Sequence, residues 1–144
     1  MTIDTNVLYQ ALRNKEGASY FILSLISDRK IRMAISVPVF TEYKDVLLRT
    51  KSLNDLGLNK EDIAAVLEFI AFIALPITIF YSFRPNLKDE GDNMFVELAI
   101  SSNSKFLITS NSSDFISGNN LLFQDLNIIT PFDFVRLWRK KYEK

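Results

Sequence analysis

The chain has 144 residues, of which 48% are apolar, enough for one globular core but not for a second. We therefore expect a single domain over residues 1–144. Its 17 basic and 17 acidic residues cancel, so no overall field attracts a polyanion. The absence of cysteine and histidine excludes zinc–thiolate sites, thiol nucleophiles and the serine–histidine–aspartate relay. Carboxylate, hydroxyl and amide oxygens remain, and these suit hard cations such as Mg²⁺ or Mn²⁺.

The chain shows no targeting or membrane signal. Residues 1–4 lack the basic and apolar segments of a signal peptide, and we expect a cytoplasmic protein. The apolar stretch 63–81 contains Glu68 and is divided by Pro76, whereas a bilayer span needs about 20 continuous apolar residues. We therefore expect a buried helix followed by a buried strand here, and no contact with a membrane.

Strand-like and helix-like patterns alternate along the first half of the chain. A short strand over residues 1–4 precedes an amphipathic helix over 17–29 and a buried strand over 31–37. Pro38 begins a helix that runs to about Thr50, and residues 52–58 form a connector. Asn59 and Asp62 stand at the positions of a capping box, which predicts a helix from there to just before Pro76.

The second half continues the alternation. The sequence predicts a strand over 76–81, a loop over 84–91, a helix from Asp92 to Asn103, a strand over 105–109, a polar stretch over 110–120, a strand over 126–130 and a helix from Pro131. Strands separated by helices favour a mainly parallel sheet with helices on both faces. The expected fold is thus a three-layer α/β/α arrangement.

Polar side chains follow the predicted strands. Asp4, Thr5 and Asn6 come after the first strand, residues 110–114 after the 105–109 strand, and Asp92 with its acidic neighbours after the 76–81 strand. Glu42 lies one turn into the helix that follows the second strand. Because the carboxyl ends of parallel strands meet at one edge, we expect these groups to converge there. Clustered carboxylates repel unless a cation neutralises them, so the pattern predicts a divalent-cation site.

Each of these residues also has a structural interpretation. Asp4 could cap the next helix, Glu42 could be a solvated helix residue, Asp92 could be an ordinary helix cap, and Asn111 could be a turn residue. None of them alone indicates a site. Their joint placement after successive strands favours the functional interpretation.

Four segments, in order, resemble the PIN-domain ribonucleases, particularly the toxin components of bacterial and archaeal toxin–antitoxin pairs. They are residues 3–8 (IDTNVL), 42–47 (EYKDVL), 92–99 (DNMFVELA) and 108–115 (ITSNSSDF). Each motif is short, but together they cover nearly the whole chain. Two positions depart from the family pattern, since Ser110 stands where glycine is usual and Asn111 where many members carry a fourth acid.

The resemblance implies a Mg²⁺- or Mn²⁺-dependent endoribonuclease that hydrolyses RNA through a metal-activated water. Asp4, Glu42 and Asp92 would hold the metal, and Asn111 completes the catalytic set. Thr5 and Asn6 would orient ligands and substrate. The resemblance leaves open whether the site holds one metal or two, and whether Asp89, Glu90 or Asp114 also binds metal.

Substrate and protein partners give further expectations. An acidic site repels phosphate, so flanking cations must help bind RNA, and Lys44 and Arg84 are our candidates. The helices after Gly17 and Asn59 are rich in apolar residues, Phe72 among them, and the chain has 12 phenylalanines. We therefore expect these helices to form a homodimer or to bind an antitoxin protein.

Two other enzyme families fit the sequence poorly. The haloacid-dehalogenase phosphatases need a second acid two residues after the first, where this chain has Asn6, and response-regulator receivers need paired acids ahead of their phosphorylated aspartate. From another class, a catalytically inactive PIN-like fold could serve as an RNA- or protein-binding module. Retention of the three carboxylates favours the enzyme, and metal-dependent RNA cleavage separates the two.

Overall fold

Five short parallel strands lie at the centre of the structure, a computed structural model that describes residues 1–79, 90–111 and 125–142. Strands β1 (Thr2–Ile3), β4 (Phe106–Ile108) and β5 (Asn127–Ile129) pair in the order β1-β4-β5, and β2 (Ala34–Ile35) pairs with β3 (Leu75–Pro76). The backbone N–H of Ala34 donates to the carbonyl of Met1 at 2.8 Å. This bond places β2 beside β1, so the strands follow the order β3-β2-β1-β4-β5.

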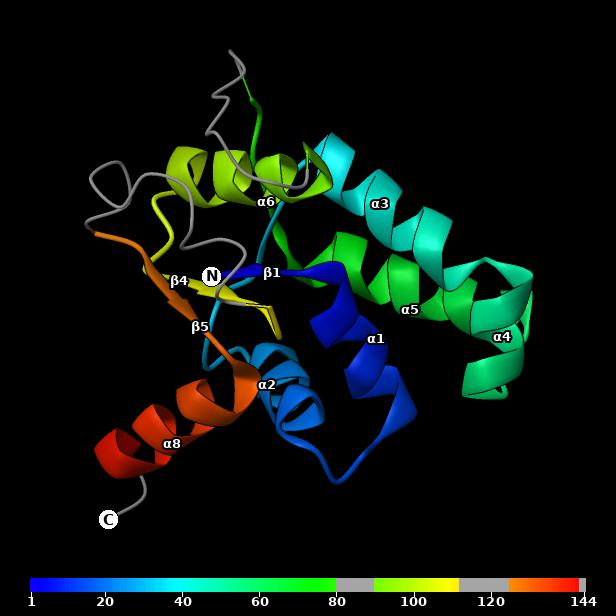
Figure 1. The fold of residues 1–144 in the computed structure, drawn as a ribbon, viewed down its shortest axis with the longest axis horizontal. Helices are drawn as coiled ribbons and strands as arrows, with labels where there is room; N and C mark the ends of the chain where they lie inside the picture. The colour runs from blue at the N-terminus through cyan, green and yellow to red at the C-terminus, as the bar shows by residue number, and fades with distance from the viewer. Residues whose placement is uncertain (80–89, 112–124, 143–144) are drawn as a thin grey trace.

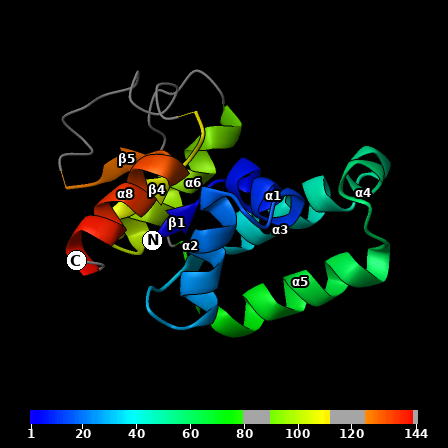
Figure 2. The ribbon, with the colours of Figure 1, turned by 90° about the horizontal axis from the view of Figure 1, so that it is seen from below.

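Helices cover both faces of these strands (Figure 1). The described helices are α1 (Thr5–Arg13), α2 (Ala18–Ser27), α3 (Val37–Leu47), α4 (Thr50–Leu56), α5 (Lys60–Ile73), α6 (Glu90–Ser101) and α8 (Pro131–Tyr142). In Figure 1, α6 and α3 lie above β1 and β4, whereas α2 and α8 lie below them. Figure 2 looks from the side of α2 and α8, and in both views α4 and the start of α5 extend farthest from the strands. The predicted three-layer α/β/α fold is confirmed.

The buried apolar side chains form one cluster between these layers. Leu107 and Ile108 of β4 are fully buried, and Ile3 of β1 is nearly so. These strands are buried on both faces, which explains why their sequences are continuously apolar rather than alternating. No helix in the part of the chain that the structure describes is long and apolar enough to cross a membrane.

Local capping signals in the sequence fix several helix starts. Asn59 accepts a hydrogen bond from the Asp62 N–H at 2.8 Å, and the Asp62 carboxylate accepts one from the Asn59 N–H at 3.1 Å. The predicted capping box is therefore confirmed. Ser36 caps α3 by accepting from the Val39 N–H at 3.3 Å, and Pro38 occupies the first turn, where its missing N–H costs nothing.

Several predicted boundaries differ from the structure. The connector over 52–58 is instead helix α4, in which half-buried Leu53 and Leu56 face the core; its Ser, Asn and Asp residues, typical of turns, conceal this packing. Gly57 ends it in the left-handed region at φ 66°. The predicted strand over 31–37 is paired only at Ala34–Ile35, because its partner β3 offers just two residues.

The other predicted strands are similarly shorter, at 106–108 and 127–129. Pro76 ends β3, an edge strand, which is where a residue without an N–H is tolerated. Helix α6 begins at Glu90 rather than at Asp92, because a single glycine at position 91 costs a helix only about 1 kcal/mol. Most of the predicted 84–91 loop, and the end of the 76–81 strand, lie outside the described residues.

Candidate active site

Asp4 stands at the carboxyl end of β1, where the strand turns into α1. Its backbone N–H donates to the Ile108 carbonyl at 2.9 Å and so extends the ladder with β4. The side chain is 7% exposed. Its Oδ1 accepts from the Thr5 N–H at 2.8 Å, and its Oδ2 accepts from the Thr109 hydroxyl at 2.6 Å. Asp4 is therefore the N-cap of α1, and both carboxylate oxygens are held in fixed directions.

Thr109 joins two of the predicted site segments. It is fully buried at the end of β4, and its hydroxyl donates to Asp4 while accepting from the Asn111 N–H at 3.1 Å. The parallel pairing of β1 with β4 thus brings Asp4 and the exposed Asn111 to the same edge, as predicted. No role for Thr109 was expected from the sequence, although its place at the end of a buried apolar strand could have pointed to one.

Tyr43 brings the helix that carries Glu42 to this edge. Its phenol is fully buried and donates to the carbonyl of Ile3 at 2.5 Å. Burial, and then the negative charge of Asp4, raise the pKa of Tyr43 well above its ordinary value. The Tyr43 phenol is therefore a neutral hydrogen-bond donor and not a general base at any physiological pH. Sequence reasoning missed this residue, because its role depends on a contact 40 positions away.

Glu42 and Lys44 flank Tyr43 on α3. Glu42 is half-buried and Lys44 is exposed. The Tyr43 ring packs against Phe95 of α6, with ring centroids 6.4 Å apart, so α3 and α6 meet at this edge. Asp92 lies in the first turn of α6, but its side chain is outside the described residues, and so is the whole of Arg84.

Three buried oxygens near this edge lack a hydrogen-bond partner among the described residues. They belong to Thr5 (Oγ1), Asn6 (Oδ1) and Asn93 (Oδ1). Thr5 and Asn6 directly follow Asp4, and Asn93 directly follows Asp92. A buried polar atom without a partner costs about 1–3 kcal/mol, and native structures usually satisfy such groups with water or an ion. The donor set here is oxygen only, which fits a hard divalent cation.

The described residues do not themselves complete a metal cage. No three acidic side chains among residues 1–79, 93–111 and 125–142 lie close enough together to hold an ion. The predicted triad includes Asp92, which that set does not contain. The convergence of Asp4, Glu42 and Asp92 on one cation therefore stays a prediction.

Two hollows with shared lining residues lie between this edge and the basic face of α8, and we treat them as one groove. Its first part, about 340 Å³, lies beside Ser110 and Thr130 at the ends of β4 and β5, and its second part, about 470 Å³, lies between α2 and α8. The two parts share Gly17, Ala18 and Phe132. We call this hollow the α2–α8 groove.

Aromatic rings and guanidinium groups line the α2–α8 groove. Phe132 is 64% exposed, and the Arg136 guanidinium carbon lies 5.8 Å from its ring centroid. Arg139 lies over the Phe21 ring at 5.1 Å. Cationic groups beside exposed aromatic rings are the combination that binds single-stranded nucleic acid. The basic run at the C-terminus is visible in the sequence and alone indicates only a solvated helix end, but the fold brings Phe21 of α2 beside it.

Comparison with known proteins gives a family match and a similar archaeal protein. A family model described as a PIN domain matches residues 1–113, a range that contains Asp4, Glu42, Asp92 and Asn111. An uncharacterized protein of Methanocaldococcus jannaschii is 30% identical over an alignment of 149 residues, which covers 97% of this chain and 92% of that protein.

Proposed function

This chain belongs to the PIN-domain family, whose members are generally metal-dependent nucleases, and on that premise we propose that it is an endoribonuclease. The cofactor would be Mg²⁺ or Mn²⁺, and the ligands would be Asp4, Glu42 and Asp92. The substrate class is RNA, and the reaction is hydrolysis of a phosphodiester bond. The single observation that carries the proposal is the Asp4 carboxylate, held at the sheet edge by Thr5 and Thr109.

The surroundings of Asp4 support a cation. A carboxylate that is 7% exposed is costly to keep ionised unless hydrogen bonds and opposite charge compensate. Two hydrogen bonds are present, and unpartnered oxygens of Thr5 and Asn6 lie next to it in sequence. When bound, a divalent cation supplies a water of lowered pKa and neutralises phosphate charge, so a chain without histidine needs no other base.

The chain's own residues orient these groups. Thr109 fixes the direction of the Asp4 carboxylate, as hydrogen-bonding partners of metal ligands commonly do. Tyr43 excludes water from the inner side of the site and stays neutral. Thr5, Asn6 and Asn111 would orient the ligands, the attacking water and the RNA.

RNA has two candidate approaches to the site. Lys44 on α3 is exposed and, together with Arg84, would contact phosphates on one side. On the other side the α2–α8 groove offers Phe132, Arg136 and Arg139. A single strand suits this groove better than a duplex, because only unpaired bases can stack on Phe132.

The biological role we propose is that of the toxin in a toxin–antitoxin pair. The resemblance of the four sequence segments supports it, with the antitoxin protein and a second copy of the chain as partners in the cytoplasm. Expression of the chain alone in bacteria should then arrest growth, and co-expression of the product of an adjacent small gene should restore it. Growth arrest that persists in an Asp4→Asn variant would contradict a toxin that acts by cleavage.

The nuclease itself is tested by cleavage of labelled RNA with purified protein. We expect cleavage with Mn²⁺ or Mg²⁺, none with EDTA, and a loss of at least about a hundredfold in Asp4→Asn, since even partners of metal ligands contribute about 10–100-fold. Asp28→Asn is the matched control, because Asp28 is exposed and precedes β2, at the other edge of the strands. Binding of RNA with no cleavage under any metal would instead establish the inactive binding module.

A further inference from the structure

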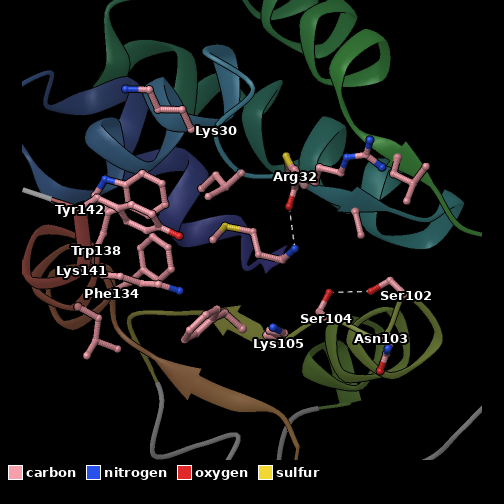
Figure 3. Close-up of a pocket in the computed structure, with 17 residues that line it drawn as sticks. Lys30, Arg32, Ser102, Asn103, Ser104, Lys105, Phe134, Trp138, Lys141 and Tyr142 are labelled. Carbon is pink, nitrogen blue, oxygen red and sulfur yellow. Dashed lines mark hydrogen bonds between the residues drawn. The ribbon is translucent and has the colours of Figure 1, made fainter.

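A cavity of about 480 Å³ opens at the edge of the sheet opposite Asp4, where the strands begin. Its walls come from the residues before β2, the start of β4, the end of α6 and the inner face of α8 (Figure 3). The volume lies within the range of about 300–1,000 Å³ that small-molecule sites occupy. None of the proposed catalytic residues lines it.

One wall is aromatic. Trp138 and Tyr142, one turn apart on α8, lie with their ring centroids 4.2 Å apart, and Tyr142 is 57% exposed. Phe134 closes the floor, only 4% exposed and edge-on to Phe106 at 5.2 Å. Figure 3 shows Trp138, Tyr142 and Phe134 grouped on the same side of the cavity. A flat ring can stack on such a wall.

The mouth of the cavity is basic. Lys30, Arg32, Lys105 and Lys141 line it, and no described lining residue is Asp or Glu. The chain as a whole has equal numbers of basic and acidic residues, so this local excess favours an anion. The Lys141 ammonium lies 5.3 Å from the Tyr142 ring centroid, which places positive charge directly beside the aromatic wall.

Serine hydroxyl groups line the wall across from the aromatic rings. The Ser102 and Ser104 hydroxyls are 2.7 Å apart, and Ser104 is 3.1 Å from the hydroxyl of Thr2. In Figure 3 these two serines face the aromatic group across the cavity. Hydroxyl groups both donate and accept hydrogen bonds, so this wall can bind a sugar.

We propose that this cavity binds a nucleotide. The base stacks on Trp138 and Tyr142, the ribose faces Ser102 and Ser104, and the phosphate lies between Lys105 and Lys141. A ligand with a flat ring, a hydroxylated middle and an anionic end matches the three walls together. The nucleotide comes either as a free mononucleotide or as one residue of an RNA strand. This site is additional to the proposed catalytic site and does not depend on cleavage.

Trp138 provides a direct readout, because it is the only tryptophan of the chain. We would titrate the wild-type protein with AMP, and separately with a ten-nucleotide oligoadenylate, in EDTA so that no metal-dependent cleavage occurs. Stacking should quench the tryptophan fluorescence saturably. The apparent Kd should rise steeply when salt is raised from 50 to 200 mM, because phosphate contacts release counterions.

Substitutions locate the binding. We expect Lys105→Gln with Lys141→Gln to raise Kd about tenfold by removing two phosphate contacts, and Tyr142→Ala to raise it about fivefold by removing one stacking ring. Lys51→Gln is the matched charge control, since Lys51 is exposed on α4 and does not line the cavity. All of these side chains are at least half exposed or charged at the surface, so the fold should survive.

Each outcome of these titrations either supports or overturns the proposed nucleotide site. Quenching by AMP and RNA assigns a nucleotide site, and quenching by RNA alone assigns a site on the RNA strand; both support the proposal. No quenching by either ligand, or quenching that the Lys105/Lys141 double variant leaves unchanged, overturns it. The result is independent of nuclease activity, because an inactive protein with this cavity would still bind.

Discussion

The hydrogen bond from Thr109 to Asp4 can be tested by a double-mutant cycle. Two effects oppose each other when Asp4 becomes asparagine. If Asp4 belongs to the proposed carboxylate cluster, its removal relieves repulsion in the metal-free protein, but the Thr109 hydroxyl, fully buried, loses its charged acceptor. A hydrogen bond to a charged group contributes about 1.5–3 kcal/mol. Repulsion between charges about 4 Å apart near a surface ranges from about 1 to 4 kcal/mol.

The contacts decide which effect is larger. Asp4 and Thr109 are held at 2.6 Å, whereas Glu42 is half-buried and partly screened. We therefore expect Asp4→Asn to lower the free energy of unfolding by about 1–2 kcal/mol, with the Thr5 cap retained through the asparagine oxygen. Thr109→Val should cost a similar amount. The double variant should cost less than the sum of both, with a coupling of about 1–2 kcal/mol.

Urea denaturation in EDTA at neutral pH measures the four unfolding free energies. Thr130→Val is the matched control, because Thr130 accepts from the Asp133 N–H at 3.2 Å and follows β5, which pairs with β4 and not with β1. Paired with Asp4→Asn it should be additive within about 0.5 kcal/mol. An Asp4→Asn protein as stable as wild type, together with additivity at Thr109, would refute the reasoning. The Asp4 carboxylate would then be held by other groups.

Three further predictions concern stability, assembly and substrate binding. Tyr43→Phe should lower the free energy of unfolding by about 1 kcal/mol at pH 7 through its lost hydrogen bond to Ile3. Because the folded pKa of Tyr43 is raised, the stability advantage of the wild type over this variant should shrink as pH rises above about 10. Denaturation at several pH values measures this, and an advantage that grows above about pH 10 would contradict a buried, neutral phenol. Phe72 on α5 is 78% exposed, so we expect Phe72→Glu to convert a dimer to a monomer, as measured by light scattering. A wild-type protein that is already monomeric would contradict the proposed dimer. Lys44→Ala should raise KM more than it lowers kcat and reduce the salt dependence of cleavage; a loss confined to kcat would place RNA binding elsewhere, with the α2–α8 groove the next surface to vary.

The sequence predicted the fold well because its strands are short, apolar and separated by helices with clear caps. The capping box at Asn59 and Asp62 and the start of α3 at Ser36 are local signals, which a single segment contains in full. Helix α4 was missed because its stability comes from Leu53 and Leu56 facing the core, a tertiary contact that turn-forming neighbours conceal.

The site was predictable only in part, because some of its contacts join residues that are distant in sequence. The parallel pairing of β1 with β4 brings Asp4 and Asn111 to one edge. The alternation of strands with helices in the sequence already predicts such a parallel sheet, and therefore that these two residues lie at the same edge. Thr109 and Tyr43 hold the site through contacts over 105 and 40 positions, and no local pattern encodes either contact. The proposed nucleotide cavity beside Trp138 and Lys105 is likewise assembled from segments that are distant in sequence.

A titration of the protein with Mn²⁺, followed by isothermal calorimetry, tests most directly whether three carboxylates share one cation. We expect saturable binding in the wild type that is weakened by a factor of about 10 or more in each of Asp4→Asn, Glu42→Gln and Asp92→Asn, and unchanged binding in Asp28→Asn. Equal Mn²⁺ affinity in the wild type and all three carboxamide variants would contradict the proposed metal site.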